Sequence, residues 1–301
     1  MSNWLIAGIE TGGTKLLARV SELESGATIG EERWSTGSPD AATNDITGFL
    51  KAAEASGDLA AVGIAAFGPL IVDPASPDYG MMLETPKPRW TGSNLRSAIE
   101  QRLQVPVAVD SDVNAAAIAE QLLGAGKQLP SVAYVTVGTG IGAGLALGGR
   151  TLKGAVHPEV GHLPIVRRSG DDLPSVCPFH ANCAEGLVSG PALRRRLGND
   201  RDPSDDPQLM DLTAEYLGQL AATLVLAWSP HCIVWGGGAI STMPIISAIE
   251  HGMREALGGY GVGDLASQPG YCVAASLENA GLEGALLMAR EIASKALKKA
   301  P

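Results

Sequence analysis

The chain has 301 residues, of which 45% are hydrophobic and 18% charged, enough apolar material for a sizeable core in one or two domains. Its net charge of −10 argues against binding to duplex nucleic acid, which needs a basic surface. No run of about 18 apolar residues predicts a membrane span, and no secretory signal opens the chain. Four cysteines are too few for a secreted disulfide scaffold, so we expect a cytoplasmic protein.

Apolar runs separated by turn residues predict the elements of the first half. Two strands, at 5–9 and 15–20, flank the glycine turn Thr11–Thr14 and form a β-hairpin. The chain order then gives a strand near 27–34, a helix at 41–56, a buried strand at 59–66, a helix at 94–103 capped by Ser93 or Asn94, a strand at 105–109 and a helix at 113–123.

The same pattern starts again about 130 residues later. Strands at 132–137 and 143–147 flank the glycine turn Gly138–Gly142. Further on we expect an irregular insertion at 166–183, a helix at 208–228, a strand at 232–235 that ends in Gly236–Gly238, and helices at 243–257 and 282–298. The repetition predicts a duplicated α/β fold with a cleft between two lobes. The short basic run Arg194–Arg196 is expected to be a solvated helix face.

Three glycine-rich turns follow strands, at Thr11–Thr14, Gly138–Gly142 and Gly236–Gly238. Glycine lets backbone N–H groups approach an anion, Thr14 and Thr139 add hydroxyl donors, and Lys15 could add charge. Neither a Walker A loop nor a full dinucleotide fingerprint occurs. Each turn by itself is better explained as an ordinary tight turn, but three turns in a duplicated fold favour phosphate binding.

The segment Asp110–Asn114 follows a predicted strand and precedes a predicted helix. Folds of the α/β class bind ligands at such strand ends, and phosphoryl transfer to a hydroxyl needs a carboxylate that accepts its proton. Asp112 is therefore a candidate general base. The alternative is that Asp110, Ser111 or Asp112 only caps the following helix.

Cys177, His180 and Cys183 lie within seven residues, and His162 lies 15 residues upstream. Zinc in structural sites prefers four Cys and His ligands, and a metal would stabilise an insertion with little apolar material. The alternatives are free thiols beside a solvent-facing histidine, or a disulfide between Cys177 and Cys183.

Taken together, these motifs resemble the ROK family (repressor, open reading frame, kinase). The resemblance runs in family order from about residue 5 to 290, through Gly8–Lys15, Asp112–Ala117, Thr136–Gly144, His157–His162 and Gly236–Gly238. Three further segments resemble its bacterial fructokinase branch, namely Phe67–Leu70, Thr85–Trp90 and Cys177–Cys183. Glu10 stands where many members carry Asp, and this resemblance leaves open whether Glu10 reaches Mg²⁺ directly or through water.

The resemblance implies a two-lobed actin-like fold of the ribonuclease H type, as in hexokinases. The small lobe would span 1–118, with a C-terminal helix at about 283–301 packing back on it. The large lobe would span 119–282 and contain a zinc-binding insertion at about 157–185. The implied activity is ATP- and Mg²⁺-dependent phosphorylation of a hexose, above all D-fructose to fructose 6-phosphate. Homodimers are usual in the family, so a homodimer is implied as well.

The resemblance also implies a role for each motif residue. Asp112 would be the general base. The sugar would be held by Asn114, Glu159, His162 and Glu185. The nucleotide would be held by Gly12, Gly13, Thr14, Lys15, Thr139, Gly140, Gly237 and Gly238. Structural zinc would be bound by His162, Cys177, His180 and Cys183, so that one ring nitrogen of His162 meets the metal and the other meets the sugar.

Three other functions are weighed against this one. A glucokinase or mannokinase could use the same scaffold. A sugar-responsive repressor of the same family would carry a helix-turn-helix before the first glycine hairpin, where this sequence has only Met1–Trp4. A sugar-binding protein without activity would not need Asp112 and two phosphate turns.

Overall fold

The computed structural model describes residues 3–85, 87, 89–198, 203–241, 243–260, 266 and 268–298. The chain forms two compact units, each considered by itself below. The first consists of Met1–Ala119, Leu152–His157 and Asn279–Pro301, and the second of Glu120–Thr151 and Pro158–Glu278. In the part of the chain that is described, no helix combines the length and apolar character that a membrane crossing requires.

The first unit is built on a five-stranded mixed sheet. Its strands are β1 (Trp4–Thr11), β2 (Lys15–Glu22), β3 (Thr28–Ser35), β4 (Asp58–Ala66) and β5 (Val107–Ser111), in the spatial order β3-β2-β1-β4-β5. β1, β2 and β3 are antiparallel neighbours, whereas β4 and β5 run parallel to β1. The pair Thr11 and Leu16 closes the first hairpin, as the sequence predicts.

The second unit repeats this sheet. Its strands are β6 (Ser131–Val137), β7 (Ile141–Leu147), β8 (Arg150–Thr151), β9 (Cys232–Gly236) and β10 (Cys272–Ala274), in the order β10-β9-β6-β7-β8. β6, β7 and β8 are antiparallel neighbours, and β9 and β10 are parallel to β6. Strand order and directions match those of the first unit, so the predicted duplication is confirmed. β8 was not predicted, because two residues carry no periodicity.

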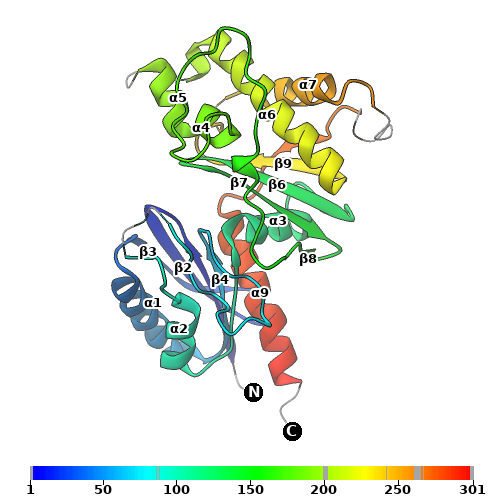
Figure 1. The fold of residues 1–301 in the computed structure, drawn as a ribbon. Helices are drawn as coiled ribbons and strands as arrows, with labels where there is room; N and C mark the ends of the chain where they lie inside the picture. The colour runs from blue at the N-terminus through cyan, green and yellow to red at the C-terminus, as the bar shows by residue number, and fades with distance from the viewer. Residues whose placement is uncertain are drawn as a thin grey trace. The chain divides into compact units, whose positions relative to one another are not determined.

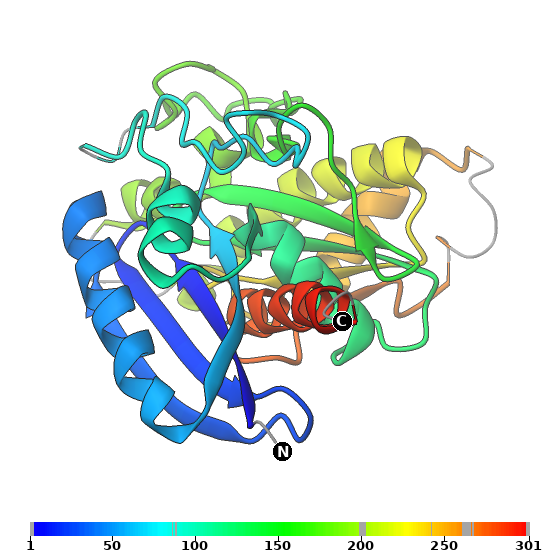
Figure 2. The same cartoon turned by 90° about the horizontal axis from the view of Figure 1, so that it is seen from below.

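Helices cover both faces of the first sheet (Figure 1). Helices α1 (Pro39–Ala53) and α2 (Leu95–Leu103, capped by Asn94) pack with Leu5, Ala7 and Ile9 on one face. On the other face α9 (Ala280–Leu297) packs against Ile6, and Figure 2 shows α1, the strands and α9 as successive layers. This alternation places Gly8 and Glu10 on the α9 side. The predicted C-terminal helix therefore packs on the first sheet, although 299–301 lie outside the described residues.

Glycines let α9 approach the strands closely. A Cβ on Gly63 of β4 would overlap the backbone of Ala285, and one on Gly8 would lie 2.7 Å from the Leu286 side chain. A Cβ on Gly284, in α9 itself, would overlap the backbone of Ala115 in α3 (Asp112–Leu122). These glycines are thus required by packing rather than by turns.

Among the described residues, the helices that lie wholly in the second unit are α4 (Ala184–Val188), α5 (Gly190–Leu197), α6 (Pro207–Trp228) and α7 (Ile246–Leu257). Short 3₁₀ turns lie at Val160–His162 and Pro203–Asp205 in this unit and at Glu54–Ser56 in the first. α6 and α7 cross where Gly218 meets the backbone of Gly252. α7 begins three residues later than expected, because Pro244 restricts Met243 to extended conformations.

The insertion between Pro164 and Cys183 is irregular, as predicted, and polar contacts hold it to the helices. Arg196 donates two hydrogen bonds to Asp171, at 2.8 and 2.9 Å, and the Tyr216 hydroxyl donates a third at 2.7 Å. The Arg196 guanidinium lowers the pKa of Asp171 to about 2. Arg194 and Arg195 are exposed as expected, but the expectation is wrong for Arg196, whose side chain is only 10% exposed.

We predict that Gly63→Ala destabilises the protein by about 1–3 kcal/mol, because the new methyl group pushes α9 away from β4. Gly48→Ala is the matched control. Gly48 is an exposed residue of α1 with open space around its Cα, so alanine there should raise the unfolding free energy slightly. Urea unfolding measures both, and equal stability of the two variants would contradict the packing described.

Candidate functional site

The first glycine turn, Gly12–Thr14, has its carbonyl oxygens bonded by groups from outside the turn. The Thr36 hydroxyl donates to the Gly12 carbonyl at 2.7 Å, and the Thr36 N–H donates to the Thr14 carbonyl at 3.0 Å. The Lys87 ammonium donates to the Gly13 carbonyl at 2.5 Å. The N–H groups of Gly13 and Thr14, in contrast, find no acceptor among the described residues. With its carbonyl oxygens bonded and two N–H groups left over, the turn suits the binding of an anion.

The glycines of the three turns differ in whether the surrounding structure leaves room for a Cβ atom. A Cβ on Gly13, Gly138 or Gly238 would meet nothing within 4 Å among the described residues, and none of these three has a positive φ. Gly237 differs, because its φ is +96° and a Cβ would overlap the backbone of Val137. The fold thus requires glycine at 237, whereas the open glycines are better explained by the close approach of a ligand.

The second glycine turn, at Gly138–Ile141, is fixed by two groups of the same unit. The N–H of Gly190 donates to the Gly138 carbonyl at 2.8 Å. The Ile141 N–H donates to Glu185 Oε2 at 3.0 Å, and a Cβ on Gly140 would lie only 2.5 Å from that oxygen. The third turn adjoins this one, since the Ala239 N–H donates to the Val137 carbonyl at 2.9 Å.

Glu10, on the α9 face of β1, is a half-buried glutamate next to the start of α9. Burial raises its pKa, and this effect is partly offset by the charge of Lys15 and the N–H of Leu282. Its Oε2 atom is buried and has no hydrogen-bond partner among the described residues. A carboxylate oxygen of this kind fits Mg²⁺ or a water bound to it, because oxygen is the ligand that Mg²⁺ prefers.

The residue that caps α3 is Ser111, the neighbour of Asp112, and not Asp112 itself. Ser111 Oγ accepts from the Asn114 N–H at 3.2 Å, which is the bond of an N-cap residue. The half-buried Asp112 accepts the adjacent Val113 N–H at 2.8 Å through Oδ1. Capping of α3 therefore does not explain the carboxylate at position 112.

Asn114 lies in a buried polar cluster that the sequence did not predict. Its Nδ2 donates to Asp110 Oδ1 at 2.9 Å and to the Leu152 carbonyl at 3.1 Å. The buried Asp110 also pairs with Lys153 at 3.0 Å. Within this cluster, Asn114 Oδ1 is a buried atom that has no hydrogen-bond partner among the described residues. Asn114 thus fastens the segment after β8 to the start of α3, and its role toward a sugar stays a prediction.

The four predicted zinc ligands lie together in the second unit. One potential ligand atom from each of His162, Cys177, His180 and Cys183 lies within 4.8 Å of the others. The Cys177 sulfur is 3.7 Å from His162 Nδ1 and 3.6 Å from His180 Nδ1. Zn–S and Zn–N bonds of about 2.3 and 2.0 Å in a tetrahedron separate S and N by about 3.5 Å, close to both distances. The cysteines are free, so this geometry fits zinc and not the alternative disulfide.

This cluster is connected to the second glycine turn through two predicted sugar ligands. Nδ1 of His162 faces the Cys177 sulfur, while its Nε2 lies 3.8 Å from Glu185 Oε1. The other oxygen of Glu185 binds the Ile141 N–H. Glu159 is exposed just before the turn that carries His162. The structure thus groups Glu159, His162 and Glu185 in the second unit, and Asp112 with the first glycine turn in the first unit.

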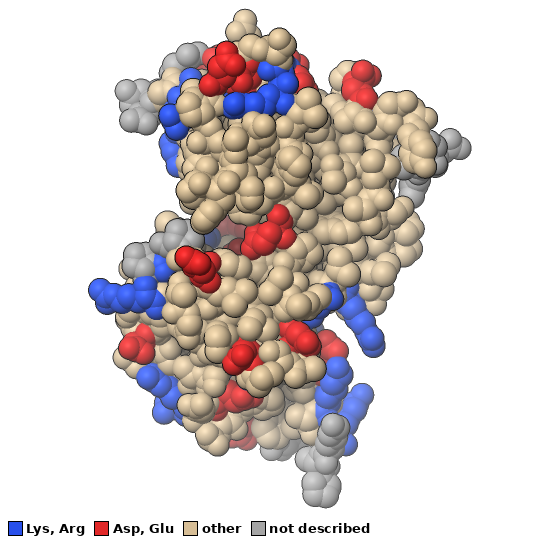
Figure 3. Space-filling model, in the orientation of Figure 1, with Lys and Arg blue, Asp and Glu red and all other residues tan. Residues whose placement is uncertain are grey.

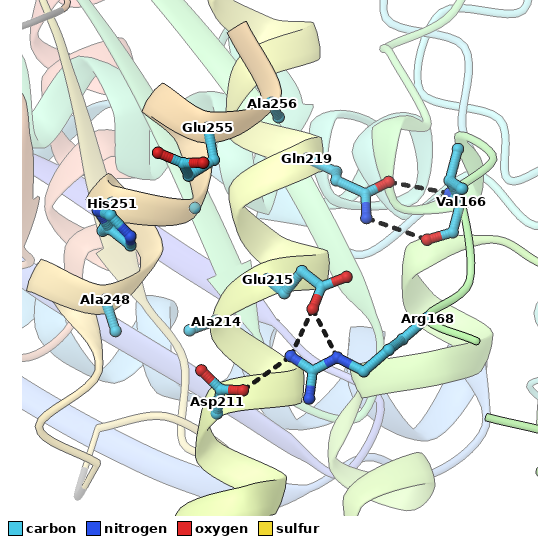
Figure 4. A pocket seen from close by; sticks show the side chains of 11 residues that line it. Val166, Arg168, Asp211, Ala214, Glu215, Gln219, Ala248, His251, Glu255 and Ala256 are labelled. Atoms are coloured by element: carbon cyan, nitrogen blue, oxygen red, sulfur yellow. Dashed lines mark hydrogen bonds and ion pairs between the residues drawn. The ribbon is translucent and has the colours of Figure 1, made fainter. Parts of the chain in front are cut away.

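A pocket of about 590 Å³ in the second unit lies between α6, α7 and the insertion and contains none of the predicted site residues (Figure 4). Arg168 reaches between Asp211, at 2.8 Å, and Glu215, at 2.6 Å. Gln219 bonds both backbone groups of Val166. These groups satisfy one another, so we assign the pocket to anchoring of the insertion. On the face drawn in Figure 3, acidic and basic side chains form small separate groups rather than a continuous basic stripe.

Comparisons with known proteins agree with the motifs. The sequence profile of the ROK family matches residues 6–292. The fructokinase of Zymomonas mobilis is 34% identical over 291 residues, covering 90% of this chain and 96% of the relative. The Thermus thermophilus ROK hexokinase superposes with a TM-score of 0.77 at 28% identity, over 97% of this chain and 99% of that one. The Streptomyces griseus ROK glucokinase with glucose and AMPPNP gives 0.73 at 28% identity, over 95% and 99%.

We predict that Gly13→Ala and Gly237→Ala separate ligand binding from folding. Alanine at 13 fits the protein but occupies space that a phosphate would approach, so melting should be unchanged and AMPPNP binding about tenfold weaker. Alanine at 237 meets backbone and a positive φ, which should lower the unfolding free energy by about 1–3 kcal/mol. Calorimetry measures both effects. Full nucleotide affinity in Gly13→Ala would contradict the ligand role of this turn.

Proposed function

This chain belongs to the ROK family, and from that membership we propose that it transfers the γ-phosphoryl group of ATP to a hexose, with D-fructose as preferred acceptor and fructose 6-phosphate as product. The predicted actin-like fold is confirmed by the duplicated sheets and by the ROK structures that superpose on the chain. The observation that carries the proposal is the first glycine turn, whose N–H groups remain for phosphate while its carbonyls are bonded elsewhere.

The nucleotide would be held by the three glycine turns. Gly12, Gly13, Thr14 and Lys15 would bind phosphate oxygens, and so would Thr139 and Gly140. Gly237 and Gly238 would line the adenosine. Mg²⁺, when bound near Glu10, would neutralise phosphate charge. Phosphoryl transfer depends mostly on such positioning and charge, so amide donors and one base suffice.

Asp112 would accept the proton of the fructose O6 hydroxyl while that oxygen attacks the γ-phosphorus. The bond from phosphorus to the β,γ-bridging oxygen breaks, and its electron pair leaves with ADP. A carboxylate suits this role, because the proton moves only as the hydroxyl oxygen loses electron density. The assignment is supported by the position of Asp112 at the end of β5, with the cap supplied by Ser111.

The sugar would be held by Glu159, His162 and Glu185, with Asn114 close to the base. Zinc on His162, Cys177, His180 and Cys183 would fix the ring of His162 through Nδ1, leaving Nε2 for a sugar hydroxyl. The Nε2 atom already points toward Glu185, which supports a shared hydrogen-bond network.

Several broader features belong to the same proposal. We assign the first unit as the small lobe and the second as the large lobe, with the zinc site in its insertion. Homodimers are expected from family membership. Four free cysteines favour a reducing compartment such as the cytoplasm.

Asp112→Asn should lower kcat by about 10²–10⁴-fold, because the amide keeps the shape of the side chain but cannot accept the proton. Fructose affinity should persist within a few fold. Steady-state ADP release and equilibrium sugar binding measure the two quantities. Near-normal turnover of this variant would rule out Asp112 as the base.

Purified protein should contain about one zinc per chain, and Cys177→Ala should lose it together with thermal stability. Cys232→Ala is the matched control, since Cys232 is a buried free thiol of β9 outside the cluster. Elemental analysis and melting curves measure the outcome. A zinc-free protein with unchanged melting and activity would refute the metal site.

Fructose should be the best acceptor, with side activity on mannose or glucose. These hexoses share their configuration at C3 to C5, so discrimination comes from contacts near C1 and C2. One or two such contacts give only about 10²-fold preference. The measurement is kcat/KM for each sugar with MgATP. If glucose exceeds fructose by more than about tenfold, the protein is a glucokinase, a function that the superposed Streptomyces griseus structure favours as second candidate.

A further inference from the structure

The segment Thr85–Trp90 is fastened beside the first glycine turn, although Pro86 and Pro88 lie outside the described residues. Trp90 is 1% exposed, and its indole N–H donates to the Gly37 carbonyl at 3.0 Å. Its ring meets that of Phe67 edge-on, with centroids 5.0 Å apart. The N–H of Phe67 in turn donates to the Thr11 carbonyl at 3.0 Å, at the end of β1. The contact between buried Trp90 and partly buried Phe67 thus holds the segment at the turn.

Lys87 is the residue of this segment that reaches the turn. Its backbone N–H donates to Thr85 Oγ1 at 3.4 Å, and its half-buried side chain places Nζ 2.5 Å from the Gly13 carbonyl. An ammonium carries three N–H donors. One bonds the Gly13 carbonyl, and none of the described residues accepts from the other two.

The donor at Gly13 differs from the donors on the neighbouring carbonyls. The carbonyls of Thr11, Gly12 and Thr14 accept from neutral groups of Phe67 and Thr36. Among the described contacts of these four carbonyls, only that of Gly13 involves a charged donor, and Gly13 is the turn glycine with open space around its Cα. A neutral donor would satisfy the carbonyl equally well, and ordering a lysine side chain costs up to about 2 kcal/mol. A cation at this point is therefore best explained by an anionic ligand.

We propose that the Lys87 ammonium, held on the Gly13 carbonyl, contacts the γ-phosphoryl group of ATP and stabilises its charge during transfer. The inference rests on the proposed function, in which the first turn holds phosphate. Lys87 gains and loses no proton. The hydroxyl proton goes to Asp112, the phosphorus–oxygen bond to the sugar forms, and the bond to the leaving ADP oxygen breaks. The positive charge lowers the energy of the negative oxygens that surround the phosphorus in the transition state.

The test compares Lys87→Met, which removes the charge, with Lys87→Arg, which keeps it. Lys51→Met is the matched control, because Lys51 is an exposed lysine at the end of α1 in the same unit. Lys87→Met should lower kcat about 10²-fold and weaken AMPPNP binding about tenfold, with MgADP affinity unchanged. Lys87→Arg should recover at least part of both losses, and Lys51→Met should match the unchanged protein.

Three outcomes would overturn the proposal. These are a Lys87→Met kcat within about threefold of the unchanged protein, equal weakening of ADP and AMPPNP, or an arginine variant as poor as the methionine variant. Equal weakening would mean that Lys87 only shapes the turn. Should the unchanged protein phosphorylate no hexose, the proposed function fails, and the comparison of ADP with AMPPNP binding still decides whether Lys87 meets the third phosphate.

Discussion

Hydrogen bonding of the carbonyl oxygens in the first glycine turn is the interaction on which the proposed chemistry depends. A turn that exposed those oxygens would repel a phosphate, even where its glycines leave space for the phosphate to approach. Thr36 and Lys87 remove this obstacle by donating to the carbonyls of Gly12, Gly13 and Thr14, so the amide N–H groups set the local field. β3 precedes Thr36 directly, which makes the antiparallel part of the first sheet a part of the site.

The glycine turn of the second unit is fixed by different groups. The N–H of Gly190 donates to the Gly138 carbonyl, and the carboxylate of Glu185 accepts the Ile141 N–H. Because Glu185 also faces His162, the proposed zinc ligands are connected through Glu185 to this turn. If zinc binds there as proposed, its removal would therefore disturb the turn as well as the insertion.

The sequence predicted what depends on local pattern, and missed what depends on long-range pairing. The order of strands and helices, the duplication and the glycine turns all follow from short-range signals. Two contacts, of Asp110 with Lys153 and of Ile141 with Glu185, join residues far apart in the chain. No short sequence motif predicts contacts of this kind. Arg196 was misassigned for the same reason, since its partner Asp171 lies in an irregular insertion. The choice of Ser111 over Asp112 as the cap likewise needed coordinates.

A crystal structure with fructose and AMPPNP tests the central claim most directly. We expect γ-phosphoryl oxygens within about 3.2 Å of the Gly13 and Thr14 N–H groups, and the fructose O6 hydroxyl within about 3 Å of the Asp112 carboxylate. Phosphates bound away from both glycine turns, or a different fructose hydroxyl at Asp112, would contradict the account.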